Sequence, residues 1–178
     1  MEEMWHRHFG VYGVCVRDQR LLVIRKTKGP YAGRFDLPGG TVEPSESLLV
    51  ALVREFSEET GSVIEPIRTI GAKDFVLPWR REGFDHTHCH HIAVFYETAW
   101  VGGEPEAAAG FDDSGGAAWV ELARLHDDEV SPLVMTAIDW LRGGVWDMRT
   151  RMYDTWTVAG TLSQANWRST NQNEPKSV

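Results

Sequence analysis

This sequence has few cysteines, no long apolar run and no surplus of basic charge. The 178 residues include two cysteines, Cys15 and Cys89, too few for the disulfide framework of a small secreted protein. No apolar stretch approaches the roughly 20 residues of a membrane span, and the first ten residues lack the basic and apolar segments of a signal peptide. We therefore expect a cytoplasmic protein in a reducing compartment, without membrane contact.

The balance of charge also limits the partners that this chain can bind. Lys and Arg number 18 and Asp and Glu number 26, which gives a net charge of −8. This balance argues against general nucleic-acid binding, although a local basic patch could still hold a phosphate. Hydrophobic residues make up 42%, as in ordinary globular proteins, and the length predicts one domain with a short appendage. The expected partner is a small molecule.

The N-terminal part of the chain reads as strands followed by a loop. Residues 11–16 and 21–25 are apolar and rich in β-branched side chains, and the polar residues between them predict a hairpin turn. Residues 27–40 contain four glycines and two prolines, so we expect a loop that ends in a tight turn at residues 37–40.

A helix is expected immediately after this loop, over residues 46–60. Ser45 is a plausible N-cap, and Gly61 can adopt the left-handed conformation that ends a helix. Apolar residues at helical spacing predict a core-facing stripe made of Leu49, Leu52, Val53 and Phe56.

The C-terminal half predicts more strands and a second helix. We expect strands over residues 67–77 and 92–101, a long mobile loop over 102–116 and a short strand over 118–120. Ser131, Pro132 and the glycine pair at 143–144 are boundary signals for a helix over 132–142.

From Val145 onward the pattern changes, so we divide the chain into a domain over 1–144 and an appendage over 145–178. Apolar side chains alternate with polar ones, which favours an extra strand or hairpin. The alternating apolar residues are Trp146, Met148, Met152, Trp156 and Val158. Such a strand must be covered by its own domain or by a second subunit, and the second alternative predicts a homodimer. The last ten residues are polar and are expected to be disordered.

Three carboxylates gather on the first predicted helix. Glu55, Glu58 and Glu59 stand at i, i+3 and i+4, so a helix places them on one side, where their like charges repel. Divalent cations that prefer oxygen ligands, such as Mg²⁺ or Mn²⁺, would offset this repulsion. The alternative is a solvated acidic face on which Arg54 pairs with Glu58.

The spacing around these glutamates resembles the Nudix box, GX5EX7REUXEEXGU, where U is a bulky apolar residue. Its fixed positions are occupied by Gly40, Glu46, Arg54, Glu55, Glu58, Glu59 and Gly61, while Ser62 departs from the last U. The stretch GRFDLPGG at 33–40 looks like the family's entrance to the box, and WVEL at 119–122 looks like its last-strand signature. The sequence is thus similar to the Nudix (MutT-like) hydrolases.

The resemblance implies an α/β (α+β) fold, an α/β/α sandwich around a mixed β-sheet. It also implies hydrolysis of a nucleoside diphosphate linked to another group, by water attacking phosphorus, with Mg²⁺ that Mn²⁺ may replace. Triphosphates, ADP-ribose and nucleotide sugars are substrates of this kind. The implied metal ligands are Glu55, Glu58, Glu59 and the Gly39 carbonyl, and the implied catalytic residues are Glu55, Glu58 and Arg54.

Further roles follow from the same resemblance. Arg54 would hold Glu46 or a metal-binding glutamate in place, and Glu46 and Gly61 would be structural parts of the motif. The general base is Glu55, Glu58 or an acidic residue of the loop between Gly102 and Gly116. The loop candidates are Glu104, Glu106, Asp112 and Asp113.

Substrate contacts are expected from Arg25, Lys28, Phe35 and Gly40. Arg25 could equally be a solvated strand end, and packing in the core is the stronger interpretation of Phe35. Pro78 lies 16 residues beyond the box, where a proline marks ADP-ribose pyrophosphatases within the family, but one proline is a weak signal.

Two alternatives to this function remain open. A non-catalytic Nudix-like sensor would bind a nucleotide without cleaving it, but sensors tend to lose box carboxylates that this chain keeps. Isoprenoid diphosphate isomerases of the same fold usually deviate from the box and fit less well. A zinc site at His86, His88 and His90 is a minor hypothesis, because their spacing matches no standard zinc motif.

Overall fold

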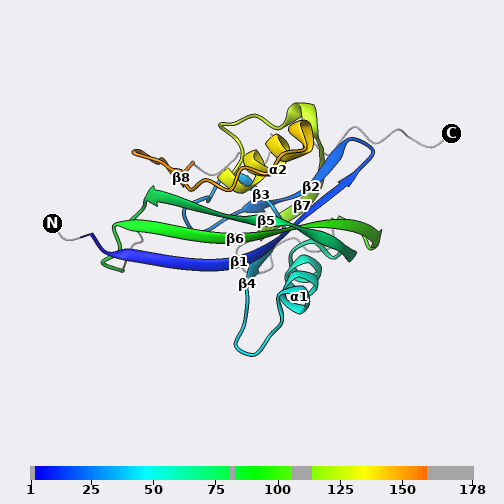
Figure 1. Ribbon diagram of the computed structural model, residues 1–178, viewed down its shortest axis with the longest axis horizontal. Helices are drawn as coiled ribbons and strands as arrows, with labels where there is room; N and C mark the ends of the chain where they lie inside the picture. The colour runs from blue at the N-terminus through cyan, green and yellow to red at the C-terminus, as the bar shows by residue number, and fades with distance from the viewer. Residues whose placement is uncertain (1–2, 81–82, 106–113, 160–178) are drawn as a thin grey trace.

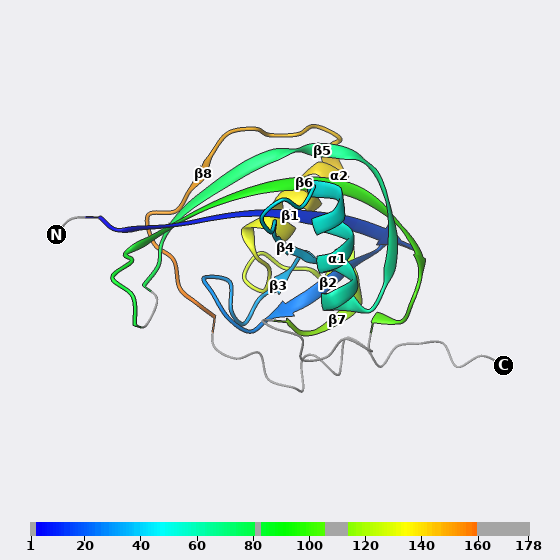
Figure 2. The same cartoon turned by 90° about the horizontal axis from the view of Figure 1, so that it is seen from below.

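A curled mixed β-sheet carries one α-helix on each of its sides (Figure 1). The computed structural model describes residues 3–80, 83–105 and 114–159. The strand order is β3-β2-β1-β6-β5-β8, with β4 paired to β1 and β7 paired to β2. Figure 2 shows the sheet from below, with α1 in front of it and α2 behind. The predicted α/β sandwich around a mixed sheet is confirmed.

The predicted N-terminal hairpin is present but longer than its apolar runs. β1 (Trp5–Arg17) pairs antiparallel with β2 (Arg20–Lys26), and the turn residues Asp18 and Gln19 both have positive φ angles, 50° and 61°. Two successive residues in this conformation fit the twist of a tight hairpin. Beyond the loop, β3 (Phe35–Asp36) pairs with β2, and β4 (Gly39–Thr41) pairs with β1.

β5 (Val63–Pro78) and β6 (His88–Gly102) form a long antiparallel pair and extend beyond the predicted strands. Three register shifts lie in the first half of β5, and one of them follows Pro66, which has no N–H to donate to a neighbouring strand. The polar start of β6 is stabilised by parallel pairing with β1, in which His8 stands opposite His91. Apolar periodicity could not reveal strand ends that depend on a distant partner.

Helix α1 (Leu48–Thr60) starts later than predicted, and its cap is Ser47 rather than Ser45. The Ser47 hydroxyl accepts a hydrogen bond from the Val50 N–H at 3.3 Å, whereas Ser45 has φ of +67° and lies in the turn before the helix. Gly61 ends the helix in the left-handed conformation, as predicted. The cap prediction was wrong because two serines two residues apart give the same local signal.

The core-facing side of α1 is rotated relative to the predicted stripe. Leu52 and Phe56 are buried, but Leu49 and Val53 are 50% and 38% exposed. The buried set is Ala51, Leu52, Phe56, Glu59 and Thr60. The helix therefore turns its glutamate side toward β4, which brings the acidic residues of the box to the sheet.

Helix α2 (Pro132–Gly143) follows the prediction closely. The Ser131 hydroxyl caps it by accepting from the Val134 N–H at 3.2 Å, and Gly144 ends it with φ of +67°. β7 (Ser114–Glu121) starts earlier than predicted, so residues 114–116 belong to a strand and not to a loop. In the described ranges, neither helix is long and apolar enough to cross a membrane.

The chain beyond α2 runs along the edge strand β5 (Figure 2). Its regular part is β8 (Arg151–Met152), which pairs parallel with Phe75 and Val76 of β5, and no hairpin forms within residues 145–159. Trp146 and Trp156 pack against the core of their own domain, whereas Met148 and Met152 are exposed. The domain division and the homodimer stay predictions. The last ten residues lie outside the described part.

Cys15 and Cys89 are both buried and carry free thiols. Burial is the main cause that raises both pKa values, for Cys89 to about 12. Both thiols therefore stay protonated at neutral pH, and each packs as a small residue in the hydrophobic core.

Candidate active site

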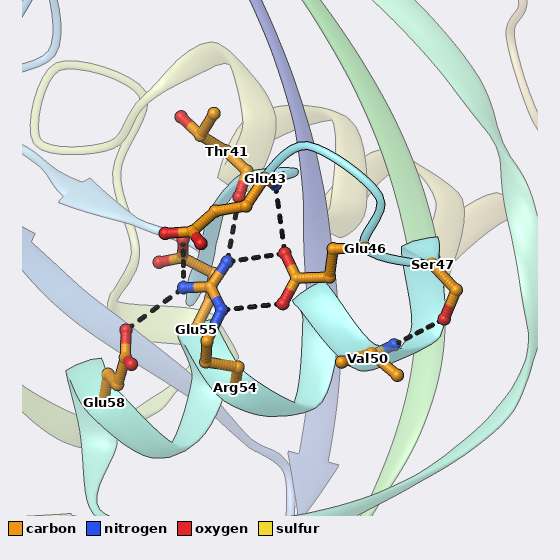
Figure 3. A network of polar contacts seen from close by, with 8 residues as sticks. All are labelled: Thr41, Glu43, Glu46, Ser47, Val50, Arg54, Glu55 and Glu58. Carbon is orange, nitrogen blue, oxygen red and sulfur yellow. Dashed lines mark hydrogen bonds and ion pairs between the residues drawn. The ribbon is translucent and has the colours of Figure 1, made fainter.

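The guanidinium of Arg54 lies among three carboxylates, that of Glu46 before α1 and those of Glu55 and Glu58 on α1 (Figure 3). Its Nε and Nη2 atoms each donate to Glu46 at 2.8 Å. Its Nη1 atom donates to Glu55 Oε1 at 2.8 Å and to Glu58 Oε2 at 3.2 Å. A further bond from Nη2 to the Thr41 carbonyl, at 3.1 Å, ties the helix to β4. One cation thus offsets the repulsion among three carboxylates.

Glu46 fixes the position of the Arg54 guanidinium. The two-point contact with Arg54, and next the backbone N–H of Glu43, lower the pKa of Glu46 to about 2. The same contact raises the pKa of Arg54. Both partners stay charged near neutral pH, so Arg54 remains fixed beside Glu55 and Glu58. The contact with Glu46 expected from the motif is present, and so is the Arg54–Glu58 pair of the alternative interpretation.

Glu55 lies over the backbone of β4, where Gly40 leaves space for it. A Cβ atom at Gly40 would come within 2.7 Å of Glu55 Oε2. The pKa of Glu55 is raised chiefly because burial disfavours the charged form, and the bond from Arg54 opposes this rise. The partly buried carboxylate of Glu55 thus occupies the space beside β4 that a side chain at position 40 would fill.

Glu59 is buried and joins α1 to the first residue of β4. Its Oε2 accepts a hydrogen bond from the Gly39 N–H at 2.9 Å. Gly39 has φ of +143°, a conformation that other residues rarely adopt, and a Cβ atom there would lie 2.1 Å from the Val11 carbonyl oxygen. The two glycines of the predicted tight turn therefore serve its conformation and its close approach to the helix.

The oxygen atoms of this site are of the kind that bind a hard divalent cation such as Mg²⁺. The Glu59 carboxylate lies at the Gly39 backbone, the Glu55 carboxylate lies over Gly40, and Arg54 links Glu55 to Glu58. Carboxylate oxygens are the ligands that such cations prefer. Within residues 3–80, 83–105 and 114–159, no three His, Cys, Asp or Glu side chains converge as a ready metal group. The bonds of Arg54 to Glu55 and Glu58 account for their present orientation.

A cavity of about 840 Å³ opens beside the box. We call its first part the box end, lined by Gly39, Gly40, Thr41, Glu55 and Glu59. We call a second part the ring end, lined by His6, His8, Tyr12, Tyr31, Trp79 and His91. Lys26 and Lys28 also line the cavity, so acidic, basic and aromatic groups share one space.

His91 is the buried hub of the ring end. Its Nε2 lies 2.9 Å from the Tyr12 hydroxyl, and its Nδ1 lies 3.1 Å from the Tyr31 hydroxyl. The Tyr12 hydroxyl also lies 3.2 Å from His8 Nε2. Burial, followed by nearby basic groups of which His8 is the first, lowers the pKa of His91 well below its usual value. The imidazole is therefore neutral at neutral pH.

Comparison with known proteins identifies the family to which this site belongs. The NUDIX domain family matches residues 4–141. The chain belongs to the Nudix hydrolase family. The predicted class of enzyme, a Nudix pyrophosphohydrolase, is thereby confirmed at the level of the family.

Several Nudix proteins resemble this chain over much of its length. It is 32% identical over 120 residues to an ADP-ribose pyrophosphatase from Methanocaldococcus jannaschii, covering 67% of this chain and 65% of that protein. It is 30% identical over 145 residues to a putative 8-oxo-dGTP diphosphatase 2 from Mycobacterium tuberculosis, covering 78% of this chain and 85% of that protein. The structure of a MutT NUDIX hydrolase from Burkholderia pseudomallei matches with a TM-score of 0.61 and 26% identity. The match covers 75% of this chain and 97% of that chain.

The structure separates the four residues that were expected to contact substrate. Lys28 and Gly40 line the cavity of this Nudix domain. Phe35 instead packs in the core, and Arg25 is not among the residues that line the cavity, where its neighbour Lys26 stands. Adjacent side chains of a strand face opposite sides, which accounts for the different places of Arg25 and Lys26. A substrate contact of Arg25 stays a prediction.

Other predicted residues take different places. Glu104 does not line the cavity, and Glu106, Asp112 and Asp113 lie outside the described residues. The three histidines proposed for zinc do not come together, because β6 begins only at His88. His90 Nε2 lies 2.8 Å from Asp74 Oδ2, while the rings of His86 and His6 are 5.3 Å apart.

Sequence reasoning missed most of the ring end of this Nudix site. His6, His8 and Tyr12 alternate along β1, a spacing that places ring side chains on one face of a strand. This signal was available, but its partners Tyr31, Trp79 and His91 come from other elements. Only the fold brings them together.

Proposed function

We propose that this Nudix chain hydrolyses the diphosphate bond of a small nucleotide derivative, with Mg²⁺ or Mn²⁺ bound at the box end. The observation that carries the proposal is the shared cavity. Glu55 and Glu59 line one end, two lysines line the same space, and flat ring side chains line the other end. A nucleotide derivative combines the same three features, namely metal-binding phosphates, negative charge and a flat base.

The size and the charges of the cavity support this class of substrate. Its volume of about 840 Å³ falls in the range of small-molecule sites. The ammonium groups of Lys26 and Lys28 attract phosphates and offset the acidic box in a chain of net charge −8. His6, His8 and Trp79 offer ring faces and edges on which a base can pack.

In this proposal Glu55, Glu58, Glu59 and the Gly39 carbonyl would hold the metal. When bound, Mg²⁺ would neutralise charge on the phosphoryl oxygens and lower the pKa of a coordinated water. Arg54 would orient Glu55 and Glu58 through the bonds described above. Glu55 or Glu58 would accept the proton from the attacking water.

Turnover of a defined panel with and without metal tests this function. The panel holds ADP-ribose, 8-oxo-dGTP, CTP and a nucleotide sugar, each with Mg²⁺, with Mn²⁺ or with EDTA. We expect the wild-type protein to hydrolyse at least one member, with activity lost in EDTA. Glu58→Gln keeps the shape but removes a charge, so kcat should fall by about 100-fold or more, in line with the loss of an electrostatic group at a reacting centre.

Glu65→Gln is the matched control, since Glu65 is an exposed residue of β5 outside the cavity, and it should keep wild-type kcat. No turnover of any member by folded, metal-loaded protein would refute the proposed hydrolase for these substrates. A thermal shift with a nucleotide but no hydrolysis would instead support the binding-only alternative.

A further inference from the structure

Trp156 reaches the cavity wall from a segment that lies beyond the family match at residues 4–141. Its indole Nε1 donates a hydrogen bond of 2.7 Å to the Pro30 carbonyl oxygen. Its ring lies nearly perpendicular to the Tyr31 ring, with 5.8 Å between centroids. The C-terminal segment therefore touches the loop between β2 and β3 at two successive residues.

Arg34 holds Trp156 from the other side of the same loop. Its guanidinium lies 4.7 Å from the Trp156 ring centroid, a cation–π contact. The Nη2 atom donates to the Thr157 carbonyl at 3.3 Å, and Nη1 donates to the Asp128 carbonyl at 2.6 Å. One side chain thus connects the C-terminal segment to the loop and to the approach of α2.

The loop that Trp156 contacts forms part of the cavity wall. Lys28, Gly29, Pro30 and Tyr31 all line the cavity. Gly29 has φ of +78°, and a Cβ atom built on it would meet no atom within 4 Å, so this point of the loop has little packing of its own. The Tyr31 hydroxyl lies 3.1 Å from His91 Nδ1. Contacts thus run from Trp156 through Tyr31 to the hub of the ring end.

We propose that Trp156 is a positioning residue for substrate binding, holding residues 28–31 so that Lys28 and Tyr31 stand in place at the cavity wall. This inference rests on the proposed function, since it assumes that the nucleotide occupies this cavity. Trp156 lines no part of the cavity itself. It acts through the loop, so its loss should weaken ground-state binding of the substrate and leave the chemistry at the box end unchanged.

Trp156→Phe and Trp146→Phe form a matched pair of variants. The Trp146 indole donates a hydrogen bond of 3.2 Å to the Ala72 carbonyl of β5, away from the cavity, and its ring packs 4.9 Å from Phe95. Each substitution keeps an aromatic ring and removes one N–H bond to a backbone carbonyl. The pair therefore separates a loss of general stability from a loss of loop position.

Hydrogen exchange and steady-state kinetics give two independent measurements. In Trp156→Phe we expect amide exchange in residues 27–36 to become about fivefold faster, the change that corresponds to one lost hydrogen bond. We expect KM to rise by about threefold to tenfold with kcat within about twofold of wild type. Trp146→Phe should leave both the exchange of this loop and KM unchanged.

Several outcomes would overturn the proposal. Unchanged exchange in residues 27–36 of Trp156→Phe would show that the indole does not hold the loop. Faster exchange with an unmoved KM would show that the loop does not bind substrate. Equal effects of the two variants would reduce the role to general stability. If the wild-type chain hydrolyses nothing in the panel, the proposed function fails as well, whereas hydrolysis with an unmoved KM overturns this proposal alone.

Discussion

The two ends of the cavity are built in opposite ways. The box end comes from one continuous stretch, because Gly39 and Glu59 are 20 residues apart and are joined by a direct hydrogen bond. The ring end comes from distant elements, since the contacts of His91 to Tyr12 and Tyr31 span 79 and 60 residues. The groups proposed for chemistry are therefore encoded locally, and those proposed for ligand recognition depend on the whole fold.

This difference indicates how the two ends should respond to change. A substitution at the box end alters charges or oxygen atoms that are held by direct contacts between α1 and β4. A substitution at the ring end disturbs buried hydrogen bonds that also stabilise the packing of β1 against β6. We therefore expect box-end variants to lose activity with little loss of stability, and ring-end variants to alter stability together with binding.

The largest effect is expected from Gly40→Ala at the box end. The added Cβ would meet the Glu55 carboxylate at 2.7 Å, and the end of a flexible side chain can move away at small cost in stability. A displacement of a reacting group by about 1 Å can reduce kcat by about 100-fold. We expect a loss of this size in kcat/KM, measured on the substrate found in the panel, with a nearly unchanged free energy of unfolding.

Gly143→Ala is the control for adding a methyl group to a glycine. Gly143 is the last residue of α2, and a Cβ atom there would meet no atom within 4 Å. This variant should keep full activity and gain up to about 1 kcal/mol of stability, because alanine restricts the unfolded chain. Full activity in Gly40→Ala would contradict the local construction of the box end.

A medium effect is expected in the pH dependence of stability, through His91 at the ring end. The folded protein keeps this imidazole neutral, while the unfolded chain binds a proton below the usual pKa of 6.5. The free energy of unfolding should therefore fall as the pH drops below about 6.5, with this one group contributing up to ~1.4 kcal/mol per pH unit. Denaturant unfolding between pH 7 and pH 5 measures this slope.

His91→Gln should reduce that slope, since glutamine does not titrate but can still bond to both tyrosines. His126→Gln is the control, because His126 is exposed and remote from the cavity. It should keep the wild-type slope. Identical slopes in wild type and His91→Gln would show that the buried imidazole does not link the ring end to stability.

The smallest effect concerns the start of α1. Ser47→Ala should lower the free energy of unfolding by about 1 kcal/mol, because the Val50 N–H loses its partner. Ser45→Gly should raise it by up to about 1 kcal/mol, because glycine adopts the positive φ of this position without strain. Chemical denaturation resolves both changes. If Ser45→Gly lowered the free energy of unfolding and Ser47→Ala did not, Ser45 would be the N-cap.

The same contrast explains what the sequence could predict. The spacing of Gly40, Glu46, Arg54 and Glu58 allowed the family and the acidic site to be inferred, because these residues lie in one short stretch of the chain and helix geometry places Arg54 beside Glu58. Helix α2 was predicted closely for a similar reason, since Ser131, Pro132 and Gly144 act at its own ends. Local rules sufficed wherever the partners are near in the chain.

The sequence-based predictions fail where the structure of a segment depends on contacts with residues far away in the chain. The exposed positions of Leu49 and Val53 reflect how α1 rests on β4, which the helical period does not reveal. The early part of β6 depends on pairing with β1, which lies far away in the sequence. The position of Trp156 could not be predicted either, since the alternation of apolar residues indicates a strand. It gives no sign of the hydrogen bond from Trp156 to the Pro30 carbonyl.

The burial of the two native thiols makes this chain convenient for spectroscopic labelling. Cys15 and Cys89 are inaccessible and protonated at neutral pH, so maleimide dyes should react slowly with them. A cysteine introduced at an exposed position, such as Asp154 near Trp156, could then carry a single fluorophore. The two native cysteines would not have to be removed first. Movement of the C-terminal segment relative to the cavity would thereby become visible in solution during turnover.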